Sequence, residues 1–241
     1  MKVIILNSGM GTRLKELTKN NPKSLVKLNE NDTIFSRAIE ILSKFEINEF
    51  IITTGYLNHV LIDYCDKRFP NINFKFVHNP IYDKTNYIKS LDLIENVDDD
   101  VILLHGDLVF SEEVAKKIIN SDETCVVIDS TIPIPQDDFK AKVKNNKITY
   151  IGVDYFDSDA VTCQPFYKLK NKEWKAWKNK IQEFCNNNQT DVYAENALNQ
   201  IIDEINIKPL DLKGLICMEV DTKDDLKKVK EILKWKQFIL P

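Results

Sequence analysis

The first half of the chain alternates short apolar runs with amphipathic segments, and this alternation limits the possible folds more than any other feature. The apolar runs have the length and the β-branched content of buried strands, and they span residues 2–6, 50–54, 74–78 and 101–105. The amphipathic segments have helical spacing, and they span residues 33–45, 58–69, 87–94 and 111–119. Strands that alternate with helices form βαβ units. The pattern therefore predicts an α/β fold with a Rossmann-like, doubly wound, mainly parallel sheet and helices on both faces.

The second half of the chain has a different pattern. Residues 140–153 predict a hairpin that turns at Asn145 and Asn146. Beyond the hairpin we expect strands at 161–169, 207–212 and 216–220, and helices at 172–184, 193–204 and 222–235. Because the sequence contains no linker, internal repeat or low-complexity tract, we expect one domain over residues 1–241.

Composition excludes several classes of partner. Asp and Glu number 37 against 33 Lys and Arg, so attraction to nucleic acid or to an anionic membrane is not expected. Apolar runs are too short for a membrane span or a signal peptide, which favours a cytoplasmic protein. The five cysteines are far apart, odd in number and free of CxxC spacing. They predict reduced thiols rather than disulfides or a zinc site.

Glycines and basic residues follow the first strand, where an open parallel sheet binds its ligands. Gly9 and Gly11 offer flexible backbone N–H groups, Arg13 offers a fork for phosphate oxygens, and Lys23 offers a mobile point charge. The loop lacks the ending of a Walker A motif, and Leu14 stands at the third glycine position of a dinucleotide fingerprint. A glycine turn with surface basic residues is the plainer alternative. Its position after the first strand favours a polyphosphate-binding loop.

The loop also carries a resemblance to a known family. The pattern Gly9-x-Gly11-Thr12-Arg13-Leu14, followed by Pro22-Lys23, resembles the nucleotidyltransferases that make activated sugars and alcohols from nucleoside triphosphates. Further landmarks of that family follow in order: Gly55-Tyr56, His105-Gly106-Asp107 and Glu219-Val220-Asp221.

A narrower resemblance lies downstream. The run 82–90 is similar to the branch of small-substrate cytidylyltransferases, which act on phosphocholine, phosphonates or phosphoglutamine. The segments 138–140, 164–169 and 193–198 resemble the same branch. The Glu-Lys-Pro segment of the sugar enzymes is missing. One departure is that Asn7 and Ser8 stand where the family has two small residues, which we expect to alter how the base packs.

The resemblance implies a reaction and a set of roles. A cytidylyltransferase transfers CMP from CTP to a small phosphorylated or phosphonate acceptor and releases pyrophosphate. Lys23 then corresponds to the catalytic lysine, Arg13 holds the β and γ phosphates, and Asp107 and Asp221 bind Mg²⁺, with Glu219 as a rival or additional ligand. The implied nucleotide-binding residues are Leu6, Asn7, Ser8, Gly9, Gly11, Thr12, Arg13, Gly55, Tyr56, Asn86, Ser90 and Gly106. The core would be 1–130, an acceptor-side insertion 131–215, and a return strand with a final helix 216–241.

The acceptor side has fewer sequence signals. Lys140 and Lys142 alternate on one strand face and could meet an incoming phosphate, although surface lysines on a hairpin are common. Glu195 and Asn196 open a predicted helix and could bind an ammonium or amide group, or Glu195 could simply offset the helix dipole. Trp174 and Trp177 form an apolar helical stripe, which favours packing over a choline cage.

Several residues and functions keep a second interpretation. Asn86, Asp107 and Asp221 could each cap a helix or a turn, and Tyr56 could belong to the core. A sugar-1-phosphate nucleotidyltransferase and a non-catalytic nucleotide-binding subunit remain alternatives. A dehydrogenase is disfavoured because Thr53-Thr54-Gly55 stands where its acidic residue would end the second strand. The oligomeric state is open, and a homodimer is compatible with the sequence.

Overall fold

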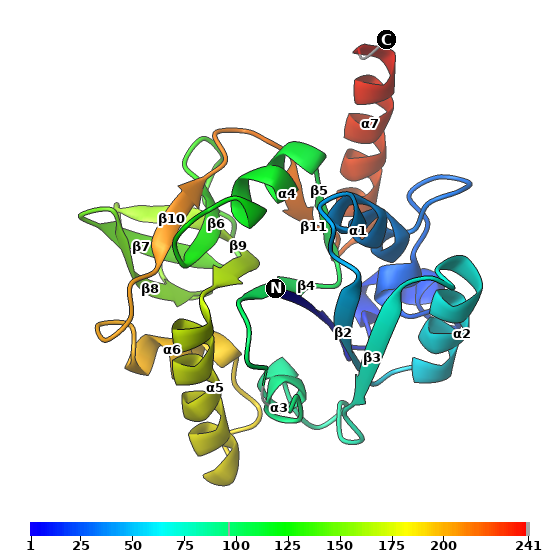
Figure 1. The fold of residues 1–241 in the computed structure, drawn as a ribbon. Helices are drawn as coiled ribbons and strands as arrows, with labels where there is room; N and C mark the ends of the chain where they lie inside the picture. The colour runs from blue at the N-terminus through cyan, green and yellow to red at the C-terminus, as the bar shows by residue number, and fades with distance from the viewer. Residues whose placement is uncertain (96, 240–241) are drawn as a thin grey trace.

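A mixed sheet runs through the middle of the molecule (Figure 1). The computed structural model describes residues 1–95 and 97–239, with side chains up to residue 234. The strand order is β10-β6-β9-β4-β1-β2-β3, with β7 and β8 attached through β9. The four strands of the first half pair in parallel, as predicted, and are β1 (Lys2–Asn7), β2 (Glu49–Thr54), β3 (Asn73–His78) and β4 (Val101–His105).

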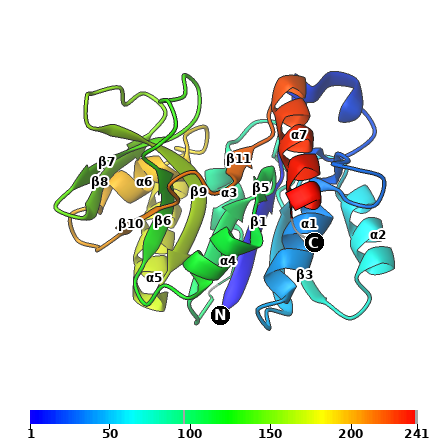
Figure 2. The ribbon, with the colours of Figure 1, turned by 90° about the horizontal axis from the view of Figure 1, so that it is seen from above.

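Strands of the second half extend the same sheet. β9 (Ala160–Leu169) lies between β4 and β6 (Cys125–Asp129) and is antiparallel to both, while β10 (Lys208–Asp211) pairs in parallel with β6. The predicted hairpin is confirmed as β7 (Lys140–Lys144) and β8 (Lys147–Gly152). Its turn residues have positive φ, 51° at Asn145 and 57° at Asn146, which suits asparagine. The hairpin and helix α2 lie at opposite ends of the molecule (Figure 2).

Helices cover both faces of the sheet, which confirms the doubly wound prediction. Val3 and Ile5 of β1 face α1 (Ile34–Ser43), α2 (Asn58–Arg68) and α4 (Glu112–Ile119). Ile4 and Leu6 face the opposite core with α3 (Tyr87–Asp92), α5 (Asn171–Asn186) and α6 (Ala194–Gln200). This alternation is the period-two pattern of a strand that is buried on both sides.

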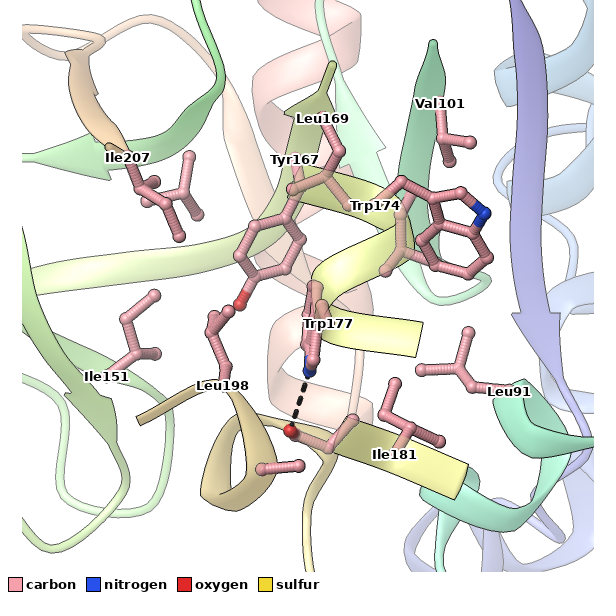
Figure 3. Packing of buried hydrophobic residues seen from close by; sticks show 14 of the residues in the cluster. Leu91, Val101, Ile151, Tyr167, Leu169, Trp174, Trp177, Ile181, Leu198 and Ile207 are labelled. Carbon is pink, nitrogen blue, oxygen red and sulfur yellow. Dashed lines mark hydrogen bonds between the residues drawn. The ribbon is translucent and has the colours of Figure 1, made fainter. Parts of the chain in front are cut away.

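The tryptophans of α5 belong to the core, as their helical spacing predicts. Trp174 and Trp177 are fully buried and pack among Leu91, Tyr167 and Ile181 (Figure 3). The indole Nε1 of Trp177 donates a hydrogen bond to the Ala194 carbonyl oxygen at 3.0 Å. That bond joins α5 to the first residue of α6.

A short two-stranded sheet lies apart from the main one. β5 (Leu108–Phe110) pairs antiparallel with β11 (Cys217–Glu219), and the final helix α7 (Lys223–Ile239) follows, with Thr222 and Asp225 forming the predicted capping box. β5 and β6 are not among the predicted elements. Two short 3₁₀ segments, η1 (Thr12–Leu17) and η2 (Lys23–Leu25), shape the loop after β1.

Two general expectations also have outcomes in the structure. The five cysteines are buried thiols, and the described residues contain no disulfide. Among the helices described in residues 1–95 and 97–239, none combines the length and apolar character that a bilayer crossing requires.

Candidate functional site

A cavity of about 640 Å³ opens at the carboxyl ends of β1 and β4, a size typical of small-ligand sites. The end of β1 and the loop after it contribute seven lining residues that were predicted for nucleotide binding: Leu6, Asn7, Ser8, Gly9, Gly11, Thr12 and Arg13. Residues of the second half, among them Phe139, Tyr193 and Asp221, line it as well. The cavity thus brings together parts of the chain that are far apart in sequence.

A charged centre lies at one side of the cavity. Lys23 Nζ is 2.5 Å from Asp107 Oδ2 and also donates a hydrogen bond to Asp221 Oδ1. Arg13 Nη2 is 2.8 Å from the same Asp221 oxygen. The two basic residues come from the loop after β1, whereas Asp107 lies between β4 and β5 and Asp221 follows β11. The structure therefore brings together all four residues predicted for catalysis and metal binding.

The electrostatics of the centre keep the lysine charged. Burial alone would lower the pKa of Lys23, but the carboxylates of Asp107 and Asp221 outweigh it and raise that pKa to about 12. Burial opposes ionisation of Asp107 too, yet Lys23 and His105 hold its pKa below the ordinary value. At neutral pH the centre therefore contains an ammonium group beside an ionised carboxylate.

Two glycines allow the close approaches on which this arrangement depends. Gly11 has a φ of +62°, and a Cβ at that position would lie 2.8 Å from Lys23 Cβ. A Cβ on Gly106 would collide with the Asn7 side chain and would lie 2.8 Å from the Leu6 carbonyl oxygen. Any side chain at these positions would displace Lys23 or separate the ends of β1 and β4.

The carboxyl groups of the cavity fit a hard divalent cation. Asp107 Oδ1 is buried and has no hydrogen-bond partner among the described residues. Carboxyl oxygens of Asp138, Glu219 and Asp221 lie within 4.8 Å of one another, and His105, Asp107 and Glu219 form a second such group. Mg²⁺ prefers oxygen ligands from one or two carboxylates, so these residues suit it in number and chemistry.

Glu219 and His105 form a largely enclosed pair beside Asp107, with side chains only 11% and 14% exposed. Their nearest atoms, His105 Nδ1 and Glu219 Oε1, are 3.4 Å apart. Burial and the neighbouring Asp107 carboxylate raise the pKa of Glu219 even though His105 opposes the shift. Burial would lower the pKa of His105, but its bond to Glu219 raises it. Glu219 therefore contributes less negative charge at neutral pH than an ordinary glutamate would.

A chain of hydrogen bonds forms another wall of the cavity. Asn79 Nδ2 donates to Ser90 Oγ at 3.1 Å, Ser90 donates to Ser8 Oγ at 2.9 Å, and Ser8 donates to Thr53 Oγ1 at 3.1 Å. Ser90 is fully buried, lines the cavity as predicted for a site residue, and fixes the hydroxyl of Ser8. Asn79 was not predicted as a site residue, although its place directly after the third predicted strand was a usable signal.

Three further predicted residues have mixed positions. Asn86 lines the cavity, and its Oδ1 also caps α3 by accepting the Tyr87 backbone N–H at 2.8 Å. Tyr56 does not line the cavity, because its hydroxyl donates to the Lys19 carbonyl oxygen at 2.8 Å outside it. Gly55 does not line it either, but a Cβ there would overlap Tyr82, which does.

The residues predicted to hold the acceptor do not reach the cavity. Lys140 is fully buried and donates hydrogen bonds to the backbone carbonyl oxygens of Gln136 and Val153. Lys142 forms an ion pair with Asp159, in which Nζ is 3.6 Å from Oδ2. Glu195 is buried and accepts hydrogen bonds from the hydroxyls of Tyr87 and Tyr167. Asn196 is exposed on α6 and does not line the cavity.

Aromatic side chains line the cavity where those residues were expected. The rings of Tyr87 and Phe139 pack against the His105 ring, with centroids 4.7 Å and 6.3 Å from it. The ring of Tyr193 also belongs to this group, with its centroid 5.2 Å from that of Phe139. Phe139 and Tyr193 were missed as site residues because aromatic side chains in a sequence are far more often core than ligand-binding.

Comparison with known protein families agrees with this geometry. The nucleotidyl transferase family model matches residues 2–140, which cover β1, β4 and the loops that carry Arg13, Lys23 and Asp107. A CTP:phosphoglutamine cytidylyltransferase from Campylobacter jejuni is 28% identical, with 94% of this chain and 98% of that protein covered. A choline-phosphate cytidylyltransferase from Streptococcus pneumoniae is 29% identical, with 97% and 99% covered.

Solved structures share the fold over nearly the whole chain. The structure of a CTP:phosphocholine cytidylyltransferase from Streptococcus pneumoniae superposes with a TM-score of 0.78. It is 24% identical and covers 96% of this chain and 98% of its own. The similarity in fold therefore extends beyond residues 2–140 into the second half of the chain.

Proposed function

Because the chain belongs to the nucleotidyl transferase family, we propose that it is a cytidylyltransferase that transfers CMP from CTP to a small phosphorylated or phosphonate acceptor. Two similar proteins that cover almost the whole chain are cytidylyltransferases by name, which supports CTP as the donor. The observation that carries the proposal is the charged centre, where Lys23 lies between Asp107 and Asp221 at the edge of a cavity of suitable size.

The chain's own residues can perform the transfer by positioning and by charge. An anionic oxygen of the acceptor forms a bond to the α-phosphorus of CTP. The bond from that phosphorus to the bridging oxygen breaks, and its electron pair leaves with pyrophosphate. No general base is needed because the attacking oxygen is already ionised near neutral pH. Lys23 offsets negative charge on both reactants, and the Arg13 guanidinium holds the departing phosphates.

We also propose that the enzyme uses Mg²⁺. Asp107 and Asp221 would hold the ion, because Asp107 has an unpartnered buried oxygen and both carboxylates border the cavity. Glu219 and Asp138 are the further oxygen ligands within reach of Asp221. When bound, the ion would supply positive charge for the phosphate oxygens. The Lys23 ammonium now lies between the two carboxylates and would move toward the phosphates of the reactants.

The best candidate for the acceptor is phosphoglutamine, used in modification of a cell-surface polysaccharide. The similarity to the Campylobacter jejuni protein over nearly the full length supports it. The cavity also carries acidic side chains near its aromatic group, among them Asp138 and Asp191, and these would attract the ammonium group of an amino-acid acceptor.

Phosphocholine is the second candidate, and one observation favours it. Tyr87, Phe139 and Tyr193 line the cavity as a cluster of three aromatic side chains, and such clusters bind quaternary ammonium ions. A 2-aminoethylphosphonate acceptor would use the same acidic and aromatic surroundings. A sugar phosphate has no cation for them to bind, so we rank it below these acceptors.

Pyrophosphate release measured with each of CTP, UTP, GTP and dTTP tests the donor, and a panel of phosphoglutamine, phosphocholine, 2-aminoethylphosphonate and glucose 1-phosphate tests the acceptor. We expect release with CTP and an acceptor that carries a cation, and none when the acceptor or Mg²⁺ is left out. Preference for UTP or dTTP with glucose 1-phosphate would replace this proposal by a sugar nucleotidyltransferase. Tight CTP binding without release from any pair would favour the regulatory-subunit alternative.

A further inference from the structure

We propose that Lys140 is a positioning residue whose buried ammonium group fastens together the two loops that form the acceptor side of the cavity. The assignment of this side of the cavity to the acceptor rests on the proposed function. The contacts by which Lys140 joins the two loops do not depend on the reaction. Lys140 does not line the cavity, so it acts through the backbone of its neighbours.

The contacts of Lys140 join two separate loops. Nζ donates to the carbonyl oxygen of Gln136 at 2.9 Å and to that of Val153. Gln136 lies in the loop between β6 and β7, and Val153 begins the loop between β8 and β9. Phe156 also belongs to this second loop. Its ring centroid lies 4.0 Å from Lys140 Nζ, which adds a cation–π contact.

Burial makes these contacts necessary for the charge. Lys140 has no exposed surface, and a buried ammonium group is costly unless acceptors surround it. Backbone carbonyls are the acceptors here, so both loops must keep their positions for the ammonium to remain satisfied. Burial also lowers the pKa of Lys140, with Asp138 as the strongest opposing influence.

Both loops contribute directly to the cavity. Asp137, Asp138 and Phe139 follow Gln136 in sequence and line it, and Val153 lines it from the other loop. Phe139 packs against His105 and Tyr193, which form the aromatic group at the acceptor side. A shift of either loop would therefore change the acceptor's surroundings directly, and it would affect the phosphate loop after β1 only through the charge of Asp138.

The test uses Lys140→Met, which keeps the length of the side chain and removes the charge, and Lys140→Arg, which keeps the charge. Lys144→Met is the matched control, because Lys144 lies on the same strand and is exposed. Phe156→Leu is a further variant, which we expect to fold because Phe156 is 52% exposed. Hydrogen exchange of residues 130–139 and 153–159 is measured together with the KM of acceptor and of CTP.

We expect Lys140→Met to speed exchange in both loops and to raise the acceptor KM about tenfold, with the CTP KM changed less than about twofold. Lys140→Arg should recover part of the acceptor KM, Phe156→Leu should loosen 153–159 alone, and Lys144→Met should match the wild type. Unchanged exchange in either loop, or equal loss for both substrates, would overturn the inference. If the wild type shows no transfer with any acceptor, the proposed function fails, while hydrogen exchange still decides whether Lys140 joins the loops.

Discussion

Lys23 carries more of the proposed chemistry than any other single residue. Its ammonium group contacts carboxylates that lie 84 and 198 residues further along the chain. Because two neighbouring anions favour the charged form of this partly buried lysine, it stays protonated and holds the aspartates close together. The same positive charge can serve reactants that are themselves anionic.

Replacing this charge gives the first prediction. Lys23→Ala should lower the rate of pyrophosphate release by about a thousandfold, because electrostatic stabilisation of the transferred phosphoryl group is lost. The circular dichroism spectrum should stay that of the wild type. Lys27→Ala, an exposed lysine in the same loop, is the control and should leave the rate unchanged. Near-normal turnover of Lys23→Ala would refute the assigned role.

Asp107 provides a second prediction, with a readout that does not need turnover. Asp107→Asn keeps the shape of the side chain and removes its negative charge. We expect Mg²⁺ to raise the melting temperature of the wild type and to have a much smaller effect on the variant, because binding to the folded state alone stabilises it. Metal-dependent pyrophosphate release should be lost as well. An unchanged response of both the melting temperature and the activity to Mg²⁺ would contradict the metal assignment.

At the scale of elements, the small β5–β11 sheet sets the geometry of the charged centre. Glu219 of β11 pairs with Leu108 of β5, and the next backbone N–H, of Val220, donates to the Asp107 carbonyl oxygen at 3.1 Å. Asp107 and Asp221 are therefore held on neighbouring strand ends. The spacing of the two carboxylates thus depends on a pairing between distant segments.

The junction of β1 and β4 gives the third prediction. Gly106→Ala should lower the free energy of unfolding by about 1–3 kcal/mol, because its Cβ would press on Asn7 and on the Leu6 carbonyl oxygen. Urea unfolding measures the change. Gly9→Ala is the matched control, since a Cβ there meets no described atom within 4 Å, and it should change stability far less. Equal effects of the two substitutions would argue against the close approach at Gly106.

At the scale of the whole molecule, the two halves of the chain share one sheet. β9 comes late in the sequence yet lies between β4 and β6 and pairs with both. Residues 1–130 therefore lack the strand that joins β4 to β6. The predicted division into a core and an acceptor-side insertion therefore does not separate two sheets. The cytoplasmic location and the homodimer stay predictions.

This shared sheet leads to the fourth prediction. A fragment of residues 1–130 should not fold on its own, because β6 would have no neighbour and the core beneath it would be open. The full chain should unfold in a single transition by both circular dichroism and tryptophan fluorescence. A fragment with a cooperative unfolding transition and native-like CTP binding would show that the first half is an independent domain.

The arrangement of elements was largely predictable, whereas the short strands were not. β1 to β4 and the hairpin at Asn145 and Asn146 followed from periodicity and turn chemistry. β5 has only three residues and is stabilised by pairing with β11, a contact that local sequence does not express. β6 was missed although its residues 125–128 are as apolar and β-branched as the runs that were predicted, so the signal was present in the sequence.

By itself, the sequence determined the α/β class, the loop after β1 and the four charged residues of the centre. The fold class follows from the local periodicity of apolar residues. The loop and the charged residues follow from short sequence motifs that resemble those of a known family. Only the tertiary structure decided which charged residues near the acceptor side face the cavity. Lys140 and Glu195 are charged, but burial gave them partners within the protein: two carbonyls for the lysine, two tyrosine hydroxyls for the glutamate. The residue type determines which interactions a side chain can make, and tertiary packing determines which groups it contacts.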